Sequence, residues 1–240
     1  RHQLMYCEIP KAASTTWLTQ FVNATGRWKE GTTMYIRGRS IERYGLKVLH
    51  SMPEDEARQR LAEYKKLVVV RHPLERLVSA WRDKFIMTED SLYRSKVGRA
   101  IIERYRGKYH EGDSATFDEF ARLVAFGSED PHWATFDKLC KPCLVRYDYI
   151  SRVETLDQDS RDVVNALEIG DTVPVMHAHR TEGVRERQSH LWQFNSVPHS
   201  HFEKLLRLFQ WDMEMFGYGF LYDNKTAYCS MLNTVGRDCC

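Results

Sequence analysis

The chain has 240 residues, of which 42% are hydrophobic and 28% are charged. This ordinary globular composition excludes a collagen, a disordered tail and a coiled coil. No stretch approaches the 18 consecutive apolar residues of a membrane-spanning helix, and residues 1–4 do not open a long apolar signal sequence. The net charge of +2 hides a basic block from Arg58 to His110, with 14 lysines and arginines against 6 acidic residues. The block indicates an anionic ligand or a solvated helix surface, while the overall balance argues against a protein that coats nucleic acid.

Strands and helices alternate along the chain. Apolar runs at 4–9 and 67–70 predict buried strands, and 144–149 is expected to form a third. Helical patterns cover residues 15–22, 53–66, 73–85, 155–167 and 199–209. The helix expected at 155–167 has a capping box at Thr155 and Gln158 and a stop signal at Gly170. With no repeat or linker in between, we expect a single domain over residues 1–240. The alternation predicts an α/β fold, a parallel sheet flanked by helices that binds ligands at its carboxyl edge.

The six cysteines do not have the spacing of a zinc site. Cys140 and Cys143 form a Cys-Lys-Pro-Cys segment, for which a local structural disulfide is preferred over redox catalysis. The even cysteine count and the two Asn-x-Thr sequons, at Asn23 and Asn224, favour an oxidising lumen.

The first candidate site is Ile9-Pro10-Lys11-Ala12-Ala13-Ser14-Thr15-Thr16-Trp17, which joins the first strand to a helix. Its lysine, its three hydroxyls and the backbone N–H groups of the helix start can bind an anion. The glycines and the Gly-Lys-Ser/Thr ending of a Walker A loop are absent. The simpler interpretation is that Ser14 or Thr15 only caps the helix.

The second candidate site begins at Arg71, directly after the second strand, and reaches Ser79 two helical turns later. An arginine fork and a serine hydroxyl are suited to a phosphate dianion. The alternative is that Arg71 and Arg76 merely pair with Glu75 or Asp83 on a surface helix.

Together, the two motifs resemble the nucleotide signatures of the sulfotransferases that use 3′-phosphoadenosine 5′-phosphosulfate. In that family a Pro-Lys-x-x-(Ser/Cys)-Thr turn holds the 5′-phosphosulfate, and an Arg followed eight residues later by Ser holds the 3′-phosphate. The resemblance implies the sulfotransferase fold, with a P-loop-like parallel sheet, and adenosine 3′,5′-bisphosphate as the product. The residues that it implies for donor binding are Lys11, Ala12, Ala13, Ser14, Thr15, Thr16, Arg71 and Ser79.

Downstream segments narrow the resemblance to the Golgi carbohydrate sulfotransferases that modify chondroitin, dermatan and the HNK-1 epitope. These segments are His132-Trp133, 139–143, 147–150, 154–156 and 212–218. Ser14 departs from the cysteine of much of this group, and Thr16-Trp17-Leu18 replaces Asn-Trp-Lys, so that the turn is closer to that of the uronyl 2-O-sulfotransferases. We expect a polyanionic glycosaminoglycan acceptor, sulfated at position 4 of N-acetylgalactosamine in chondroitin or dermatan. Uronic-acid 2-O-sulfation is the alternative.

The chemistry requires a charge on the leaving phosphate and a base for the sugar hydroxyl. We expect Lys11 to supply the charge and no metal ion to be required. His50 is expected to be the base, because the uronyl 2-O-sulfotransferases have a catalytic histidine in roughly this place; His72 is the alternative, and His50 would otherwise be structural. The arginines expected to contact the acceptor are Arg76, Arg82, Arg180 and Arg185.

The resemblance also implies a domain in the Golgi lumen, held by a membrane anchor that precedes this fragment. The alternative to an enzyme is a non-catalytic glycan-binding domain on the same fold, because the basic block from Arg58 to His110 would bind an anionic glycan equally well. A P-loop kinase is disfavoured, since a magnesium-binding Ser/Thr after the lysine and a Walker B pattern are both missing.

Overall fold

The computed structural model describes residues 3–27, 38–87, 92–168 and 192–218. Its sheet has three parallel strands in the order β1 (Leu4–Cys7), β2 (Lys65–Val70) and β3 (Tyr149–Arg152). Cys7 pairs with Val68, and Val70 pairs with Arg152, so the three strands end near a common edge. The predicted parallel sheet flanked by helices is confirmed.

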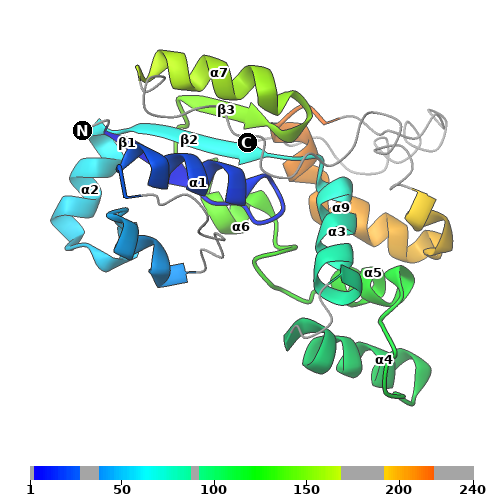
Figure 1. Cartoon of the computed structure of the whole chain (residues 1–240). Coiled ribbons are helices and arrows are strands. Elements are labelled where there is room, and N and C mark those ends of the chain that lie inside the picture. Colours follow the sequence, from blue (N-terminus) through cyan, green and yellow to red (C-terminus); the bar gives the residue numbers. More distant parts are fainter. Residues whose placement is uncertain (1–2, 28–37, 88–91, 169–191, 219–240) are drawn as a thin grey trace.

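Helices cover the sheet and extend beyond it. They are α1 (Ser14–Ala24), α2 (Glu54–Glu63), α3 (Pro73–Trp81), α4 (Arg99–Arg106), α5 (Phe117–Ala125), α6 (Phe136–Cys140), α7 (Leu156–Ala166) and α9 (His199–Met215). Short helical turns are η1 (Gly38–Tyr44), η2 (Leu49–Ser51), η3 (Arg82–Met87), η4 (Tyr93–Gly98), η5 (Val153–Thr155) and η6 (Trp192–Ser196). Figure 1 shows α3, α4, α5 and α9 grouped beyond the carboxyl end of β2. Within the described ranges, no helix combines the length and apolar character that a membrane span needs.

The central strand β2 is buried on both faces. Leu67 and Val69 pack in one cluster with Trp17 of α1 and Val163 of α7. The alternate residues 68 and 70 pack in a second cluster with Phe136 of α6. Because helices cover both faces of β2, residues 67–70 are all apolar instead of alternating between apolar and polar.

The helical layer is built on the apolar stripe of α3 and η3. Leu74, Leu77, Val78 and Phe85 are almost completely buried, as their helical spacing predicts. They belong to one cluster with residues of α4, α5 and α9. The cluster fixes α3 at its carboxyl side while Pro73 starts the helix at the end of β2, so α3 connects the sheet to this second layer.

Four local predictions differ from the structure. The third strand was expected at 144–149, but a turn in which the N–H groups of Leu144 and Val145 donate to the carbonyl of Lys141 keeps that segment out of the sheet. Asp148 then accepts from the backbone N–H of Lys66, which aligns the following residues as β3. Lys65 and Lys66 therefore begin β2 rather than ending the helix predicted at 53–66.

The capping box predicted at the start of α7 is also wrong. The Thr155 hydroxyl donates to Asp159 instead of accepting a backbone N–H, and Asp159 accepts the N–H of Arg152 as well. The last helix runs six residues beyond the predicted Phe209, to Met215. Gly170, Asn224 and the last three cysteines lie outside the described residues.

The disulfide joins Cys7 at the end of β1 to Cys140 at the end of α6, 133 residues apart. The predicted local disulfide between Cys140 and Cys143 is therefore wrong, and Cys143 is exposed. Cys140 is buried against the sheet by Phe136 and Phe216, which places its sulfur beside β1 rather than beside Cys143. The bond therefore attaches α6 covalently to β1, on the face of the sheet that α6 covers.

Replacing both partners, in the variant Cys7→Ser/Cys140→Ser, should lower the free energy of unfolding by about 2–5 kcal/mol, because the unfolded chain loses a large closed loop. Chemical unfolding of both proteins measures the difference. Cys143→Ser is the control and should unfold like the parent. An unchanged midpoint for the double variant would contradict the assigned disulfide.

Candidate functional site

The turn after β1 places a lysine and a helix start at the carboxyl edge of the sheet. Lys11 and Ala13 have left-handed backbone conformations, with φ of 68° and 55°. Ala12 between them is fully buried. No side chain among the described residues caps α1 at Ala13. The N–H groups of the first helical turn are therefore suited to an anion.

The three hydroxyl residues of this turn have different surroundings. The Ser14 hydroxyl donates to the carboxylate of Glu8, a contact that lowers the pKa of this carboxyl, although burial raises it overall. Thr15 is exposed, and Thr16 is buried. Of the three predicted donor-binding hydroxyls, Ser14 and Thr15 therefore keep exposed surface.

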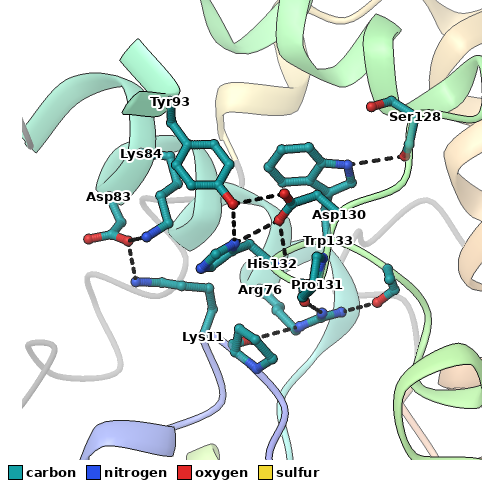
Figure 2. A network of polar contacts seen from close by, with 12 residues as sticks. Lys11, Arg76, Asp83, Lys84, Tyr93, Ser128, Asp130, Pro131, His132 and Trp133 are labelled. Atoms are coloured by element: carbon teal, nitrogen blue, oxygen red, sulfur yellow. Dashed lines mark hydrogen bonds and ion pairs between the residues drawn. The ribbon is translucent and has the colours of Figure 1, made fainter. Parts of the chain in front are cut away.

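Lys11 is tied to the helical turn that follows α3. Its Nζ lies 3.3 Å from Oδ2 of Asp83, and the same oxygen lies 2.9 Å from Nζ of Lys84 (Figure 2). Burial lowers the pKa of Lys11; Asp83 opposes this shift, and the charges of Lys84 and Arg71 add to it. Three cations thus gather where β1 and β2 end.

Arg71 is the cation that the second motif supplies. It follows β2 directly, is 6% exposed, and its Nε lies 3.5 Å from Oε2 of Glu75. The predicted alternative of an Arg71–Glu75 pair is thus present, but the pair is buried rather than on a surface helix. Ser79 is half-buried farther along α3. The two motifs follow neighbouring parallel strands, so they lie at the same edge of the sheet, and the charge of Arg71 contributes to the lowered pKa of Lys11.

A histidine, a carboxylate and a tyrosine lie beside these cations (Figure 2). Nδ1 of His132 is 2.7 Å from Oδ1 of Asp130, which also accepts the backbone N–H of His132. The Tyr93 hydroxyl donates to Oδ2 of Asp130 at 2.8 Å and lies 3.1 Å from Nδ1 of His132. Nζ of Lys84 lies 5.2 Å from the centre of the Tyr93 ring, which joins this cluster to the cations.

The surroundings of His132 favour a neutral imidazole. Burial lowers its pKa below the ordinary 6.5; Asp130 opposes this shift, while the charges of Lys84 and Lys11 add to it. Although burial raises the pKa of Asp130, hydrogen bonds from His132 and Tyr93 hold it below its ordinary value. At pH 7 the pair is therefore a neutral imidazole beside a carboxylate.

Arg76 is not available to an acceptor, contrary to the sequence-based expectation. It is 1% exposed, and its guanidinium donates to the backbone carbonyls of Pro10, Pro131 and Ala134 at 3.0, 3.1 and 2.7 Å. Its charge also lies over the ring of Phe136, 5.2 Å from the centroid. Arg76 is a structural residue that fixes the turn after β1 and the loop of His132.

The other predicted acceptor-binding arginines are placed only in part. Arg82 begins η3, next to Asp83, and is partly exposed. Arg180 and Arg185 lie outside the described residues. In the part of the chain that the structure describes, no group of three His, Cys, Asp or Glu side chains could hold a metal ion.

The structure does not bring His50 to Lys11. His50 is exposed in η2, a segment whose contacts run to Glu42 through Ser51 and to Glu56 through Lys47. Figure 1 shows α2 and the segment leading into it on the side of the strand starts, away from α3. The role of His50 as the base stays a prediction without support from this placement.

His72, the alternative base, is 3% exposed. Its Nδ1 accepts the N–H of Leu74 and caps α3, while its backbone N–H donates to Glu154. Both contacts are structural.

Sequence reasoning missed the acidic and aromatic members of this site. Asp83 was expected only as a surface partner of Arg71 or Arg76, and His132 only as part of a family segment. Lys84, Tyr93 and Asp130 belong to no motif that the sequence analysis singled out. Only His132 carried a signal in the sequence. The contacts that assemble the site join segments far apart in the chain, such as Lys11 with Asp83 and Tyr93 with Asp130, which no local pattern reveals.

Residues 1–219 of the chain match the Sulfotransferase family. The chain belongs to this family. It is 31% identical to carbohydrate sulfotransferase 14 of Danio rerio over 238 residues, which cover 95% of this chain and 63% of that protein. It is also 31% identical to carbohydrate sulfotransferase 11 of Rattus norvegicus over 230 residues, covering 90% and 65%. To carbohydrate sulfotransferase 9 of Homo sapiens it is 36% identical over 171 residues, covering 67% and 38%.

The chain therefore spans just under two thirds of the length of the first two relatives. No solved structure matches it. The resemblance drawn from the two motifs and the downstream segments is confirmed at the level of the family.

Replacing Arg76 tests its structural role. Arg76→Met should lower the free energy of unfolding by more than about 3 kcal/mol, because three buried carbonyls lose charge-assisted hydrogen bonds. Arg76→Lys should destabilise as well, since an ammonium cannot reproduce the planar fork. Urea unfolding measures both. Arg58→Ala, on the exposed face of α2, should leave the midpoint unchanged, and a stable Arg76→Met protein would show that the fork is dispensable.

Proposed function

We propose that this sulfotransferase moves a sulfuryl group from 3′-phosphoadenosine 5′-phosphosulfate to a hydroxyl of a glycosaminoglycan. The observation that carries the proposal is the placement of Lys11 and Arg71 after the ends of neighbouring parallel strands. Such strand ends are where open α/β sheets bind their ligands. The membership in the family supports the same chemistry.

The chain's own residues fit a donor with two phosphate positions. The turn from Lys11 to Thr16 would hold the 5′-phosphosulfate through its ammonium, its backbone N–H groups and the hydroxyls of Ser14 and Thr15. Arg71 and Ser79 would hold the 3′-phosphate. The fit rests on the uncapped start of α1 and on Lys11, Lys84 and Arg71 gathered there, because partial burial strengthens the attraction of these cations for an anion.

In the reaction, Lys11 would stabilise charge on the leaving phosphate. That charge grows as the bond between sulfur and the bridging oxygen breaks, so its stabilisation contributes to kcat. Asp83 pairs with the Lys11 ammonium, and it opposes the lowering of the lysine pKa that burial causes. The proposed transfer requires no metal ion.

For the acceptor, we propose position 4 of N-acetylgalactosamine in chondroitin or dermatan. The support for this position is the resemblance of downstream segments, such as His132-Trp133, to the group that modifies chondroitin and dermatan. The similar proteins, which are named carbohydrate sulfotransferases, support a carbohydrate acceptor. The Ser14-Thr15-Thr16 turn favours the second candidate, uronic-acid 2-O-sulfation. The proposed location is the Golgi lumen, which the Cys7–Cys140 disulfide supports because such bonds persist in oxidising compartments.

Donor binding is tested by calorimetric titration with adenosine 3′,5′-bisphosphate. Arg71→Ala should weaken binding about 10- to 150-fold, roughly 1.5–3 kcal/mol, because it removes a charge-assisted contact to the 3′-phosphate. Ser79→Ala should weaken it less, and Arg58→Ala should leave it unchanged. No binding by the parent protein at high micromolar nucleotide would exclude the proposed donor.

Acceptor choice is tested with labelled donor and desulfated chondroitin, dermatan or heparan, followed by disaccharide analysis. We expect label at position 4 of N-acetylgalactosamine. Label at position 2 of the uronic acid would establish the second candidate instead. Elution from heparin only at raised salt, with neither transfer nor nucleotide binding, would identify a non-catalytic glycan-binding domain.

A further inference from the structure

We propose that His132 is the general base that takes the proton of the acceptor hydroxyl, with Asp130 and Tyr93 as its positioning residues. The inference rests on the proposed sulfuryl transfer and replaces His50 in that role. It stands on the placement of His132 beside Lys11 and Lys84, and on the contacts that occupy one nitrogen of its ring.

The contacts of His132 determine which nitrogen carries the proton. The carboxylate of Asp130 can only accept, so Nδ1, at 2.7 Å, donates to it. In a neutral ring, Nε2 then has the lone pair. Figure 2 shows this second nitrogen on the side of the ring that faces the amino groups of Lys84 and Lys11. A neutral base thus faces the place where the sulfuryl group would be held.

Asp130 is itself held in place from two directions. Its Oδ1 accepts the backbone N–H of His132, and its Oδ2 accepts the Tyr93 hydroxyl at 2.8 Å. The loop behind the pair is anchored by Arg76, which binds the carbonyl of Pro131 between them. The imidazole therefore has one preferred orientation, as a general base requires.

The His132 side chain is 24% exposed and that of Lys11 is 22% exposed, so both can be reached by bound substrates. His72 is almost fully buried and uses its Nδ1 to cap α3, so it cannot serve in the same way. His132 is the partly exposed histidine that the described structure connects to Lys11.

In the proposed step, the acceptor oxygen forms a bond to sulfur while its proton passes to Nε2 of His132. The bond between sulfur and the bridging oxygen breaks, and its electron pair stays on the 5′-phosphate of the departing nucleotide beside Lys11. The imidazolium that forms is stabilised by the carboxylate of Asp130, and it later loses its proton to water.

The groups facing His132 determine the expected pH dependence. Lys84, Lys11 and Asp130 act on the ring, and Asp83 pairs with both lysines. Together with burial, the two lysines place the pKa of the imidazole below its ordinary value despite Asp130. Turnover should therefore fall only below about pH 6.5, as protonation removes the lone pair. Asp130→Asn removes a negative charge, so it should move this fall to still lower pH and reduce the rate.

The test compares turnover with nucleotide affinity. His132→Ala and His132→Asn should lower kcat by about 10²- to 10⁴-fold, with labelled donor and desulfated dermatan, while the calorimetric Kd for adenosine 3′,5′-bisphosphate stays within about twofold. Both variants should also lose the acidic fall of the pH–rate profile. His199→Ala, on an exposed face of α9, is the matched control and should behave like the parent.

A nuclear magnetic resonance titration of the histidines tests the same assignment without turnover. In the parent protein we expect the Nδ1–H tautomer of His132 and an apparent pKa below 6.5. Asp130→Asn should lower that pKa, and Tyr93→Phe should leave the ring neutral at pH 7. A proton on Nε2, or a ring charged at pH 7, would overturn the proposal.

Near-normal turnover of either folded His132 variant would also overturn the proposed role of His132. The same holds if His50→Ala loses turnover while the His132 variants keep it. Failure of the parent to bind the nucleotide would instead refute the proposed function, so the two failures are distinguishable.

Discussion

The fork of Arg76 is the interaction on which the site depends. From the middle of α3 its guanidinium binds the carbonyl of Pro10, next to Lys11, and the carbonyls of Pro131 and Ala134, on either side of the His132–Trp133 pair. One buried side chain thus connects the turn after β1 with a loop more than 100 residues later. Because the fork is planar and its donors diverge, it determines the distance between those segments as well as their contact.

A second buried ionisable side chain completes this anchor. Asp212 of α9 accepts the N–H of Phe136 with both carboxylate oxygens, at 2.9 and 3.0 Å, at the start of α6. Burial raises its pKa to about 7, although the backbone N–H groups and the charge of Arg76 favour the ionised form. A helix start and a guanidinium are the surroundings that make a buried carboxylate tolerable. The loop that carries His132 is thereby held between α3 and α9.

The partners of each charged side chain distinguish structural residues from residues that can bind a substrate. Glu154 accepts the backbone N–H of His72 and the hydroxyl of Tyr218, so it joins the ends of β2 and β3 to the end of α9. The charges near Lys11 are arranged differently. The side chains of Lys11 and Asp83 are partly exposed, and the buried Lys84 pairs with the same carboxylate of Asp83. A partly exposed cation such as Lys11 can exchange its carboxylate partner for a substrate anion. The guanidinium of Arg76 cannot, because its donors are bound to three backbone carbonyls.

The sequence by itself determined the α/β class, the family, the two motifs and most helices, because each depends on neighbouring residues. The apolar run of β2, the stripe of α3 and the Lys11 turn are local patterns with local physical causes. Only the tertiary structure decided the Cys7–Cys140 bond, the register of β3 set by Asp148, the burial of Arg76 and the pairing of His132 with Asp130 and Tyr93. Spacing along the chain says whether an arginine or a histidine stands on a helix or in a loop. It does not say which distant carbonyl, carboxylate or sulfur the folded chain brings within 3 Å, and this distance separates a structural arginine from a binding one.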